Sequence, residues 1–451
     1  MDFLKTRFAV IGLGDTGISI VNYLIYKGAS NITLFDTRVN PPNYDKFANY
    51  KLILGDLKYD DFVNIDVIVL SPGLSIYHKA IQQAINNGIK VVGDIELFAL
   101  EINKLPVKVI GITGSNGKTT VTTLTGYLAE KLGYKTLVAG NIGTPVLKSF
   151  IEFDKTATYP ELIVLELSSF QLETTYSLTL DSATVLNLSE DHLDRYRDLL
   201  EYAYVKANIF NNSKVQVLNS DDKLVMAMAR QSQKKFYFGS NAQDYSLAYY
   251  VNELYLCINQ QRYLKSNDLR LIGKHNYYNV LASIALLSSV GIDIHSLPFM
   301  DSLKSFQGLE HRMQKVLIHN NITYIEDSKG TNVGAVVAGI SGIDGVVHLL
   351  LGGDGKGQDF SPLRDVVKNK CASVAIIGQD KYKILESLNG INKNIQLFDK
   401  LEDAVVFLIN NAKPSDYVIL SPACASWDMF NNYKHRAEVY IQSIKNTLYL
   451  N

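Results

Sequence analysis

The sequence predicts an α/β protein built from successive units that contain parallel sheets. Short apolar runs that suit buried strands alternate with helix patterns along the 451 residues. This alternation favours parallel sheets covered by helices on both faces. Glycine-rich turns follow two of the runs, at 12–17 and 111–117. The chain is longer than one hydrophobic core supports, so we expect several domains.

The first unit is expected to span 1–93. Asp15–Lys27 fits an amphipathic helix, because apolar side chains recur at Ile18, Val21 and Leu24. The strands expected in this unit are 8–12, 32–36, 66–71 and 89–94.

The second unit is expected to span 94–306 and the third 307–451. A helix from Lys118 to about Leu132 follows the first strand of the second unit, and a final helix is expected from about Trp427. The strands expected in these two units are 106–114, 136–140, 162–166, 182–188, 346–353, 373–378 and 417–421.

Composition excludes several classes of protein. With 47% hydrophobic residues, 20% charged residues and a net charge of −1, the chain has no global bias toward nucleic acid or anionic membranes. No apolar run reaches the roughly 18 residues that a membrane helix needs. Three widely spaced cysteines fit neither a disulfide framework nor a zinc cluster. We therefore expect a cytoplasmic monomer that acts on small molecules, without nucleic-acid partners or membrane insertion.

The stretch "GITGSNGKTT" (111–120) has the context of a phosphate-binding loop, between a buried strand and a helix. Backbone N–H groups at such a helix N-terminus favour anionic oxygens. Lys118 would add a positive charge beside the phosphates, and Thr119 a hydroxyl ligand for Mg²⁺. The common spacing would place the first glycine where Ile112 stands, so an ordinary glycine-rich turn is the alternative.

The turn "GLGDTG" (12–17) predicts a site for a nucleotide or nucleotide sugar near Gly14 and Gly17. Asp36 ends the next strand, where an NAD-binding protein carries its ribose-binding acid, so the motif alone also suits NAD or a purely structural turn. Further polar residues are expected to face the same crevice, at the ends of neighbouring strands: Thr37, Arg38, Ser71, Pro72 and Gly73.

Glu166 closes a strand beside the phosphate loop, where a Mg²⁺ ligand is needed, although a helix-capping acid is the alternative. His192 lies in an acidic turn and is equally well explained as a ligand or as part of a helix N-terminus. Lys206 sits among apolar residues on a helix, where a lysine is more often a surface residue.

The third unit carries basic and hydroxyl groups at the ends of strands and linkers, which suits an anionic small molecule. They are Arg312, Lys329, Thr331, Lys356 and Ser426. Cys424 lies between alanines and is interpreted as a packing residue rather than a nucleophile.

These motifs, in this order, resemble the Mur ligase family over essentially the whole chain. The family loop G-x-T-G-(S/T)-N-G-K-(S/T)-T is matched at every place by 111–120, including the early glycine. The resemblance implies a Rossmann-like UDP-binding domain, a central P-loop ATPase domain and a C-terminal Rossmann-like domain. It also implies amide formation driven by ATP, through an acyl phosphate, in peptidoglycan synthesis.

Within the family, "SPACASWDMF" (421–430) is most similar to the members that join D-glutamate to UDP-N-acetylmuramoyl-L-alanine. The resemblance then implies Lys118, Glu166, His192 and Lys206 as catalytic residues. The ATP contacts implied are Gly114, Ser115, Asn116, Gly117, Lys118, Thr119, Thr120, Asn279, Arg312, Asp327 and Lys329, with His311 nearby.

The same resemblance implies three further residue sets. Two Mg²⁺ ions would be held by Thr119, Glu166, His192 and a carbamylated Lys206. The UDP-substrate contacts would be Gly14, Asp15, Thr16, Asp36, Thr37, Arg38, Ser71, Pro72, Gly73, Asn141, Ser168 and Gln171. The D-glutamate contacts would be Thr331, Lys356, Ser426 and Tyr433.

Four alternatives remain at this point. Another Mur-type ligase, one that adds diaminopimelate or lysine, is disfavoured because no Asp-Asn-Pro-Arg stretch occurs. An NAD-dependent dehydrogenase would explain 12–17 and Asp36 but would leave the phosphate loop without a role. A nucleotide-dependent switch protein would hydrolyse ATP without an acceptor. A folylpolyglutamate-type ligase would carry its phosphate loop near the N-terminus, whereas here about a hundred residues precede Lys118.

Overall fold

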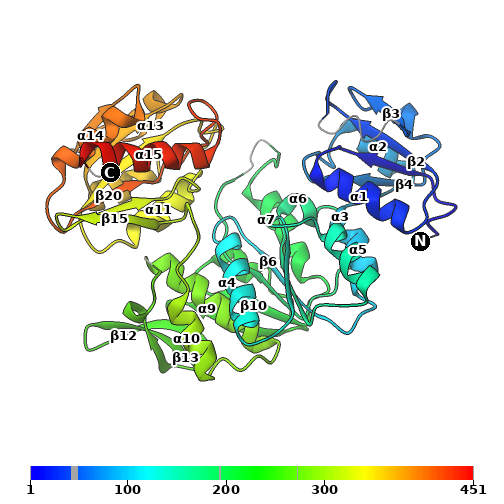
Figure 1. Cartoon of the computed structure of the whole chain (residues 1–451), viewed down its shortest axis with the longest axis horizontal. Helices are drawn as coiled ribbons and strands as arrows, with labels where there is room; N and C mark the ends of the chain where they lie inside the picture. Colours follow the sequence, from blue (N-terminus) through cyan, green and yellow to red (C-terminus); the bar gives the residue numbers. More distant parts are fainter. Residues whose placement is uncertain (1, 42–48, 192–194, 272, 450–451) are drawn as a thin grey trace.

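The computed structural model describes residues 2–41, 49–191, 195–271 and 273–449. They form three α/β lobes, each built around one sheet and named here in chain order the first, the central and the third lobe (Figure 1). The first lobe (blue) and the third lobe (yellow to red) lie on different sides of the central lobe. None of the helices formed by the described residues is long and apolar enough to cross a membrane.

Within the described residues, the first lobe contains a five-stranded parallel sheet in the order β3-β2-β1-β4-β5. Its strands are β1 (Phe8–Ile11), β2 (Ile32–Asp36), β3 (Lys51–Leu54), β4 (Val67–Leu70) and β5 (Lys90–Val92). Its helices are α1 (Asp15–Tyr26), η2 (Tyr59–Phe62) and α2 (Lys79–Asn86). The sequence missed β3, a short and partly exposed edge strand.

The central sheet runs β14-β13-β12-β11-β10-β9-β6-β8-β7. Its strands are β6 (Lys108–Thr113), β7 (Thr136–Gly140), β8 (Leu162–Glu166), β9 (Ser182–Val185), β10 (Val215–Asn219), β11 (Lys234–Gly239), β12 (Tyr245–Tyr250), β13 (Glu253–Ile258) and β14 (Gln261–Lys265). The helices here are α3 (Asp94–Ile102), α4 (Lys118–Lys131), α5 (Val146–Thr156), α6 (Ser169–Leu172), α7 (Leu199–Ala207), η3 (Asn208–Phe210), α8 (Lys223–Ala227), η4 (Ser266–Asp268), α9 (Lys274–Ser289) and α10 (Leu297–Ser305).

The expectation of parallel sheets needs a correction in this lobe, because β12, β13 and β14 pair antiparallel. They are joined by the tight turns Val251-Asn252 and Asn259-Gln260, whose residues all have positive φ. Two consecutive positive-φ residues form the hairpin turn that matches strand twist. In the sequence only the asparagines indicate such turns, and this signal was too weak to predict the hairpins.

The third sheet runs β15-β16-β20-β17-β18-β19 and is parallel except for β15. Its strands are β15 (Gln314–His319), β16 (Ile322–Glu326), β17 (Val347–Gly352), β18 (Cys371–Ile377), β19 (Asn394–Leu397) and β20 (Tyr417–Leu420). Its helices are α11 (Val333–Ser341), α12 (Leu363–Lys370), α13 (Lys381–Ser387), α14 (Leu401–Asn411) and α15 (Tyr433–Thr447).

The last helix, α15, begins later than expected from Trp427. Asn432 caps it, since its side-chain oxygen accepts hydrogen bonds from the N–H groups of Lys434 and His435. An asparagine at this position satisfies N–H groups that have no partner inside the helix. Residues 421–432 therefore remain a loop after β20, with Ser426 in its middle and Tyr433 directly after it, as the first residue of α15.

The hydrophobic cores differ in how they relate to the lobes. One core combines the first and central lobes, and Tyr23, Phe98, Phe150 and Leu165 belong to it. Two other cores lie wholly within the third lobe. The first two lobes are thus packed as one body, and the third has an interior of its own.

Candidate functional site

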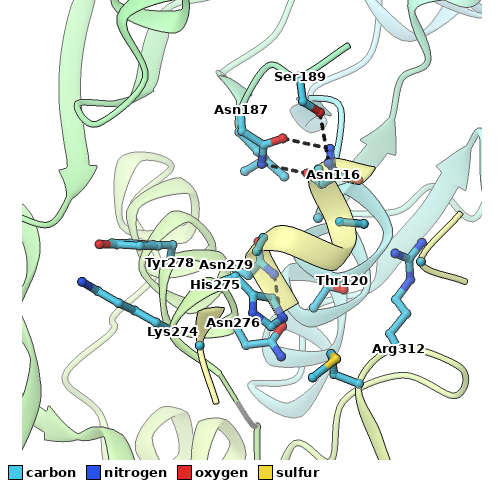
Figure 2. A pocket seen from close by; sticks show the side chains of 18 of the residues that line it. Asn116, Thr120, Asn187, Ser189, Lys274, His275, Asn276, Tyr278, Asn279 and Arg312 are labelled. Atoms are coloured by element: carbon cyan, nitrogen blue, oxygen red, sulfur yellow. Dashed lines mark hydrogen bonds between the residues drawn. The ribbon is translucent and has the colours of Figure 1, made fainter. Parts of the chain in front are cut away.

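The phosphate loop connects the end of β6 to the start of α4. Gly117 has φ +83°, a conformation that favours glycine, and a Cβ there would lie 2.6 Å from Asn279 Oδ1, so a larger residue would also displace that side chain. Asn187, which follows the neighbouring strand β9, fixes the position of the loop. Its Oδ1 accepts from the Asn116 N–H at 2.9 Å, and its Nδ2 donates to the Asn116 carbonyl at 3.0 Å (Figure 2).

Lys118 lies inside this loop. Its Nζ donates to the carbonyls of Gly114 and Ser115, each at 2.8 Å. Burial lowers the pKa of Lys118, while the negative charges of Glu166 and Asp191 act in the opposite direction. The loop therefore holds an ammonium group at its centre, beside N–H groups that favour anions.

Glu166, at the end of β8, is 2% exposed. Its Oε1 accepts a hydrogen bond from Asn141 Nδ2 at 2.8 Å, whereas its Oε2 has no hydrogen-bond partner among the described residues. A buried carboxylate oxygen without a donor suits a cation. His192, the predicted histidine ligand, lies outside the described residues. Among the described residues, no group of three or more His, Cys, Asp or Glu side chains is arranged to hold a metal ion.

Lys206 is 1% exposed, so the interpretation from the sequence that a lysine here is a surface residue was wrong. Its Nζ donates to Thr113 Oγ1 at 3.2 Å and lies 4.6 Å from the centre of the Tyr202 ring. Burial, and then the charge of Lys118, hold the pKa of Lys206 well below its usual value. Burial favours the neutral amine, the form that can act as a nucleophile.

Two side chains of the third lobe reach the phosphate loop. Arg312 donates from Nη2 to Thr119 Oγ1 at 3.0 Å, and Asn332 donates from Nδ2 to Asn116 Oδ1 at 3.1 Å. Thr119, a predicted metal ligand, is therefore already in contact with a cation from another lobe.

A cavity of about 430 Å³ lies between the loop, α9 and the third lobe (Figure 2). Of the predicted ATP contacts, those that line it are Asn116, Gly117, Thr120, Asn279, Arg312, Asp327 and Lys329. The sequence did not single out four further lining residues from α9 and its start: Lys274, His275, Asn276 and Tyr278. Their signal was weak, because a helix start without phosphate-loop glycines has no distinctive pattern.

Asp327 and His311 border this region from the third lobe. Asp327 accepts hydrogen bonds from the Met313 N–H at 3.1 Å and from the Ser421 hydroxyl at 2.6 Å. Burial raises the pKa of Asp327 to about 7. His311 Nδ1 lies 2.8 Å from a carboxylate oxygen of Glu326, which fixes the orientation of the ring.

Three of the predicted D-glutamate residues lie on loops that meet at the carboxyl ends of β16, β17 and β20, and the fourth, Tyr433, begins α15. The Ala423 N–H donates to the Gly330 carbonyl at 2.9 Å, and Asp354 and Ala425 exchange two backbone hydrogen bonds. These contacts join the loops that carry Thr331, Lys356 and Ser426. Tyr433 lies next to Lys329, a predicted ATP contact that lines the cavity, because Lys329 Nζ is 3.9 Å from the centre of its ring.

Arg436 is a residue that the sequence analysis missed. It is 0% exposed and ties two of these loops together. Its guanidinium donates to Ser328 Oγ at 2.9 Å, to the Ser328 carbonyl at 2.8 Å and to the Cys424 carbonyl at 3.1 Å. Its position one helical turn after Tyr433 was the available signal. Cys424 is buried, as expected of a packing residue, and burial raises its pKa.

In the first lobe, both carboxylate oxygens of Asp36 accept hydrogen bonds from neighbouring residues of the same lobe. It is 1% exposed, and its Oδ2 accepts from the Leu13 N–H at 2.8 Å and from Arg38 Nη2 at 2.7 Å. Its Oδ1 accepts from Arg38 Nε at 2.8 Å. The carboxylate therefore orients the first turn and Arg38, whereas a dehydrogenase needs it to accept hydrogen bonds from a ribose.

The turn at 12–17 is tightly packed against the neighbouring strand end. A Cβ on Gly17 would lie 1.9 Å from the Gly12 carbonyl oxygen, so α1 approaches the turn only because residue 17 is glycine. Ser71 donates its hydroxyl to the same carbonyl at 3.0 Å. The structure thus brings together the strand ends carrying the predicted residues Gly14, Asp15, Thr16, Thr37, Ser71, Pro72 and Gly73.

Ser168 and Gln171 open α6, directly after β8. They form a capping box, in which Ser168 Oγ accepts from the Gln171 N–H and Gln171 Oε1 accepts from the Ser168 N–H. Gln171 also hydrogen-bonds Asp94, which is buried at the start of α3. Burial raises the pKa of Asp94 to about 6.

Comparison with family models matches all three lobes. The matches are the N-terminal domain of MurD-like Mur ligases at 6–93, the Mur ligase middle domain at 112–287 and the Mur ligase glutamate ligase domain at 311–424.

Curated relatives cover nearly the full chain. The chain is 43% identical over 459 aligned positions to the UDP-N-acetylmuramoylalanine–D-glutamate ligase of Nitrosomonas eutropha, covering 99% of this chain and 97% of the relative. It is 44% identical to the enzyme of the same name from Methylobacillus flagellatus, covering 96% of each chain.

Solved structures share the architecture. The MurF ligase of Thermotoga maritima in complex with ADP aligns with a TM-score of 0.61 at 16% identity, over 100% of this chain and 99% of that one. The UDP-N-acetylmuramate–alanine ligase MurC of Thermotoga maritima aligns with a TM-score of 0.59 at 16% identity, over 98% and 100%.

Proposed function

Because the chain belongs to the Mur ligase family, we propose that it uses ATP to join D-glutamate to UDP-N-acetylmuramoyl-L-alanine. The observation that carries the proposal is the meeting of the phosphate loop and the basic groups of the third lobe at one cavity. Buried Glu166 ends the strand paired with β6, which leads into the loop. The product would serve peptidoglycan synthesis and, through it, cell shape and division.

The chemistry needs an activated carboxyl group, because a free carboxylate is a poor electrophile. The L-alanyl carboxylate oxygen attacks the γ-phosphorus of ATP and ADP leaves, which gives an acyl phosphate. The amine of D-glutamate then attacks the acyl carbon, loses a proton, and phosphate leaves. Lys118 and Arg312 lie beside the loop where negative charge would develop, and fixed positive groups stabilise such charge.

Mg²⁺ fits the acidic side of this site. Glu166 Oε2, Thr119 and His192 would hold it, with Lys206 added if carbamylated, and two ions would be accommodated by this set. Bound Mg²⁺ would neutralise charge on the phosphate oxygens. The orphaned Oε2 of Glu166 supports the proposal.

Carbamylation of Lys206 is chemically consistent with its burial. A neutral amine and CO₂ form an N–C bond with loss of one proton, which turns the side chain into an anion. In ¹³CO₂ solution the wild-type protein should give a carbamate signal in the ¹³C NMR spectrum that the Lys206→Ala variant lacks. That variant should also lose most activity, and near-normal turnover by it would contradict the assignment.

The remaining residue sets follow the lobes. We assign the sugar nucleotide to the turns at 12–17, 36–38 and 71–73, with Asn141, Ser168 and Gln171. D-glutamate is assigned to Thr331, Lys356, Ser426 and Tyr433. We further propose a cytoplasmic monomer whose partners are these small molecules, with domain boundaries at 93 and 306.

The test is phosphate release from ATP and Mg²⁺ with UDP-N-acetylmuramoyl-L-alanine, in the presence of D-glutamate, of L-glutamate or of neither. Release should require both the sugar nucleotide and the D isomer. Lys118→Ala should abolish it, whereas Lys131→Ala, an exposed lysine at the end of the same helix, should not. Release that does not depend on the amino acid would refute the ligase reaction.

A further inference from the structure

Arg195 links the central lobe to the substrate turn of the first lobe. Its Nη1 donates to the Pro72 carbonyl at 3.0 Å, and its Nη2 donates to the Leu74 carbonyl at 3.0 Å. Arg195 lies between β9 and α7 of the central lobe, whereas the turn follows β4 of the first lobe. The sequence analysis gave Arg195 no role.

The guanidinium is held firmly on its central-lobe side. Its Nη2 also donates to Glu173 Oε2 at 2.5 Å, and the two side chains are 9% and 2% exposed. Its central carbon lies 3.8 Å from the centre of the Phe170 ring. The other oxygen of Glu173 accepts from the Tyr196 hydroxyl at 2.6 Å. A buried, charge-assisted and stacked arginine has a well-defined position.

Glu173 belongs to a segment that is attached to the chain where it leaves the first lobe and enters α3. The Gly93 N–H donates to the Thr174 carbonyl at 3.2 Å, and Glu96 accepts from the N–H groups of Tyr176 and Ser177. The same segment begins with Ser168 and Gln171. Arg195 therefore connects the turn after β4 to the segment that carries two other predicted substrate residues.

The two carbonyl contacts determine how the turn presents its N–H groups. In a trans peptide the C=O and N–H bonds point in opposite directions. Because the Pro72 carbonyl is directed at Arg195, the Gly73 N–H of the same peptide is directed away from it. Likewise, the Leu74 carbonyl is directed at Arg195, so the Ser75 N–H is directed away from it. N–H groups fixed on one side of a turn favour an anion such as a diphosphate.

We propose that Arg195 is a positioning residue for the sugar-nucleotide substrate. It holds the 72–74 turn so that the N–H groups of Gly73 and Ser75 face the anionic part of that ligand. The inference rests on the proposed function, which supplies the identity of the ligand. Arg195 acts through the turn and has no part in phosphoryl transfer.

The test compares Arg195→Gln and Arg195→Lys with Arg197→Gln, a matched variant of an exposed arginine that contacts Glu201. Arg195→Gln should raise KM for the sugar nucleotide roughly ten-fold or more, since it loses charge-assisted hydrogen bonds. KM for ATP and for D-glutamate should stay within about two-fold, and so should kcat. Lysine keeps the charge but cannot span both carbonyls, so Arg195→Lys should fall between.

Amide hydrogen exchange of the ligand-free proteins gives a second readout that does not depend on the reaction. Exchange in 72–76 should be faster in Arg195→Gln than in the wild type and Arg197→Gln, with the rest of the first lobe unchanged. Glu173→Gln should shift exchange in the same direction, because it removes the counter-charge.

The outcomes separate the two proposals. An unchanged KM for the sugar nucleotide, or an equal rise of all three KM values, would overturn the role of Arg195 while leaving the ligase reaction intact. No turnover by the wild-type protein would overturn the proposed function instead. In that event unchanged exchange in 72–76 would overturn the positioning of the turn as well.

Discussion

The two junctions of the central lobe are built differently. Toward the first lobe the junction has a shared apolar core, in which Tyr23 on α1 meets Phe150 on α5 edge to face, with ring centres 6.0 Å apart. Polar contacts such as those of Arg195 lie beside this core. Toward the third lobe the contacts to the phosphate loop are polar, with the Arg312–Thr119 and Asn332–Asn116 hydrogen bonds beside a cavity.

The difference indicates which junction can open. Separating the first two lobes would expose a shared core, and each buried apolar side chain contributes about 1.5–3 kcal/mol. Separating the third lobe exchanges polar contacts for contacts with water, at about 0.5–1.5 kcal/mol per hydrogen bond. We therefore expect the first junction to set stability and the second to respond to ligands.

The largest expected effect is at the first junction. Phe150→Ala should lower the free energy of unfolding by about 3–5 kcal/mol, because Phe150 is 3% exposed and packs against both lobes. Urea denaturation measures this, with Phe398→Ala in the third lobe, a partly buried ring, as the comparison. A loss below about 1 kcal/mol would mean that the first two lobes do not share a core.

At the second junction the expected effect is on activity rather than on stability. Arg312→Gln should lower kcat/KM roughly 10²–10³-fold, since it removes a fixed positive group beside the phosphate loop. The midpoint of urea unfolding should stay near that of the wild type. A drop in stability comparable to that of Phe150→Ala would contradict the distinction between the junctions.

The sequence predicted the features that depend on local signals and missed those that depend on distant parts of the chain. The strands β1, β6 and β8, and the phosphate loop, were predicted because apolar runs and glycines are local signals. Lys206, Arg195 and Arg436 were missed or misinterpreted, because their burial depends on residues far away in the chain. The hairpins β12–β14 were missed because Val251 and Gln260 adopt positive φ without being glycine.

A buried acid at each junction gives a pH-dependent comparison. Burial raises the pKa of Asp94 to about 6 at the first junction and that of Asp327 to about 7 near the second. An acid whose pKa is raised by folding stabilises the folded state below its unfolded pKa, and this contribution is lost as pH rises through the folded pKa. Asp94→Asn should thus gain stability relative to the wild type between about pH 4 and 6.

The gain should reach about 1–3 kcal/mol and then stay constant above about pH 6. Urea denaturation of both proteins between about pH 4 and 8 measures it, and taking the difference removes the contribution of other groups such as His275. For Asp327→Asn the gain should continue to about pH 7. A difference between wild type and Asp94→Asn that does not vary with pH would show that Asp94 titrates normally.

The smallest expected effect isolates one contact of the second junction. Asn332→Ser keeps an oxygen to cap α11, where Asn332 accepts from the Ala335 N–H, but serine is too short to reach Asn116. Stability should change by less than about 1 kcal/mol, while small-angle scattering of the ligand-free variant should give a larger radius of gyration than the wild type. The exposed Asn389→Ser should match the wild type. Because ATP would contact both lobes across the cavity, adding it should bring the variant back toward the wild-type value, and a variant that stays expanded with ATP would mean that the nucleotide does not close this junction.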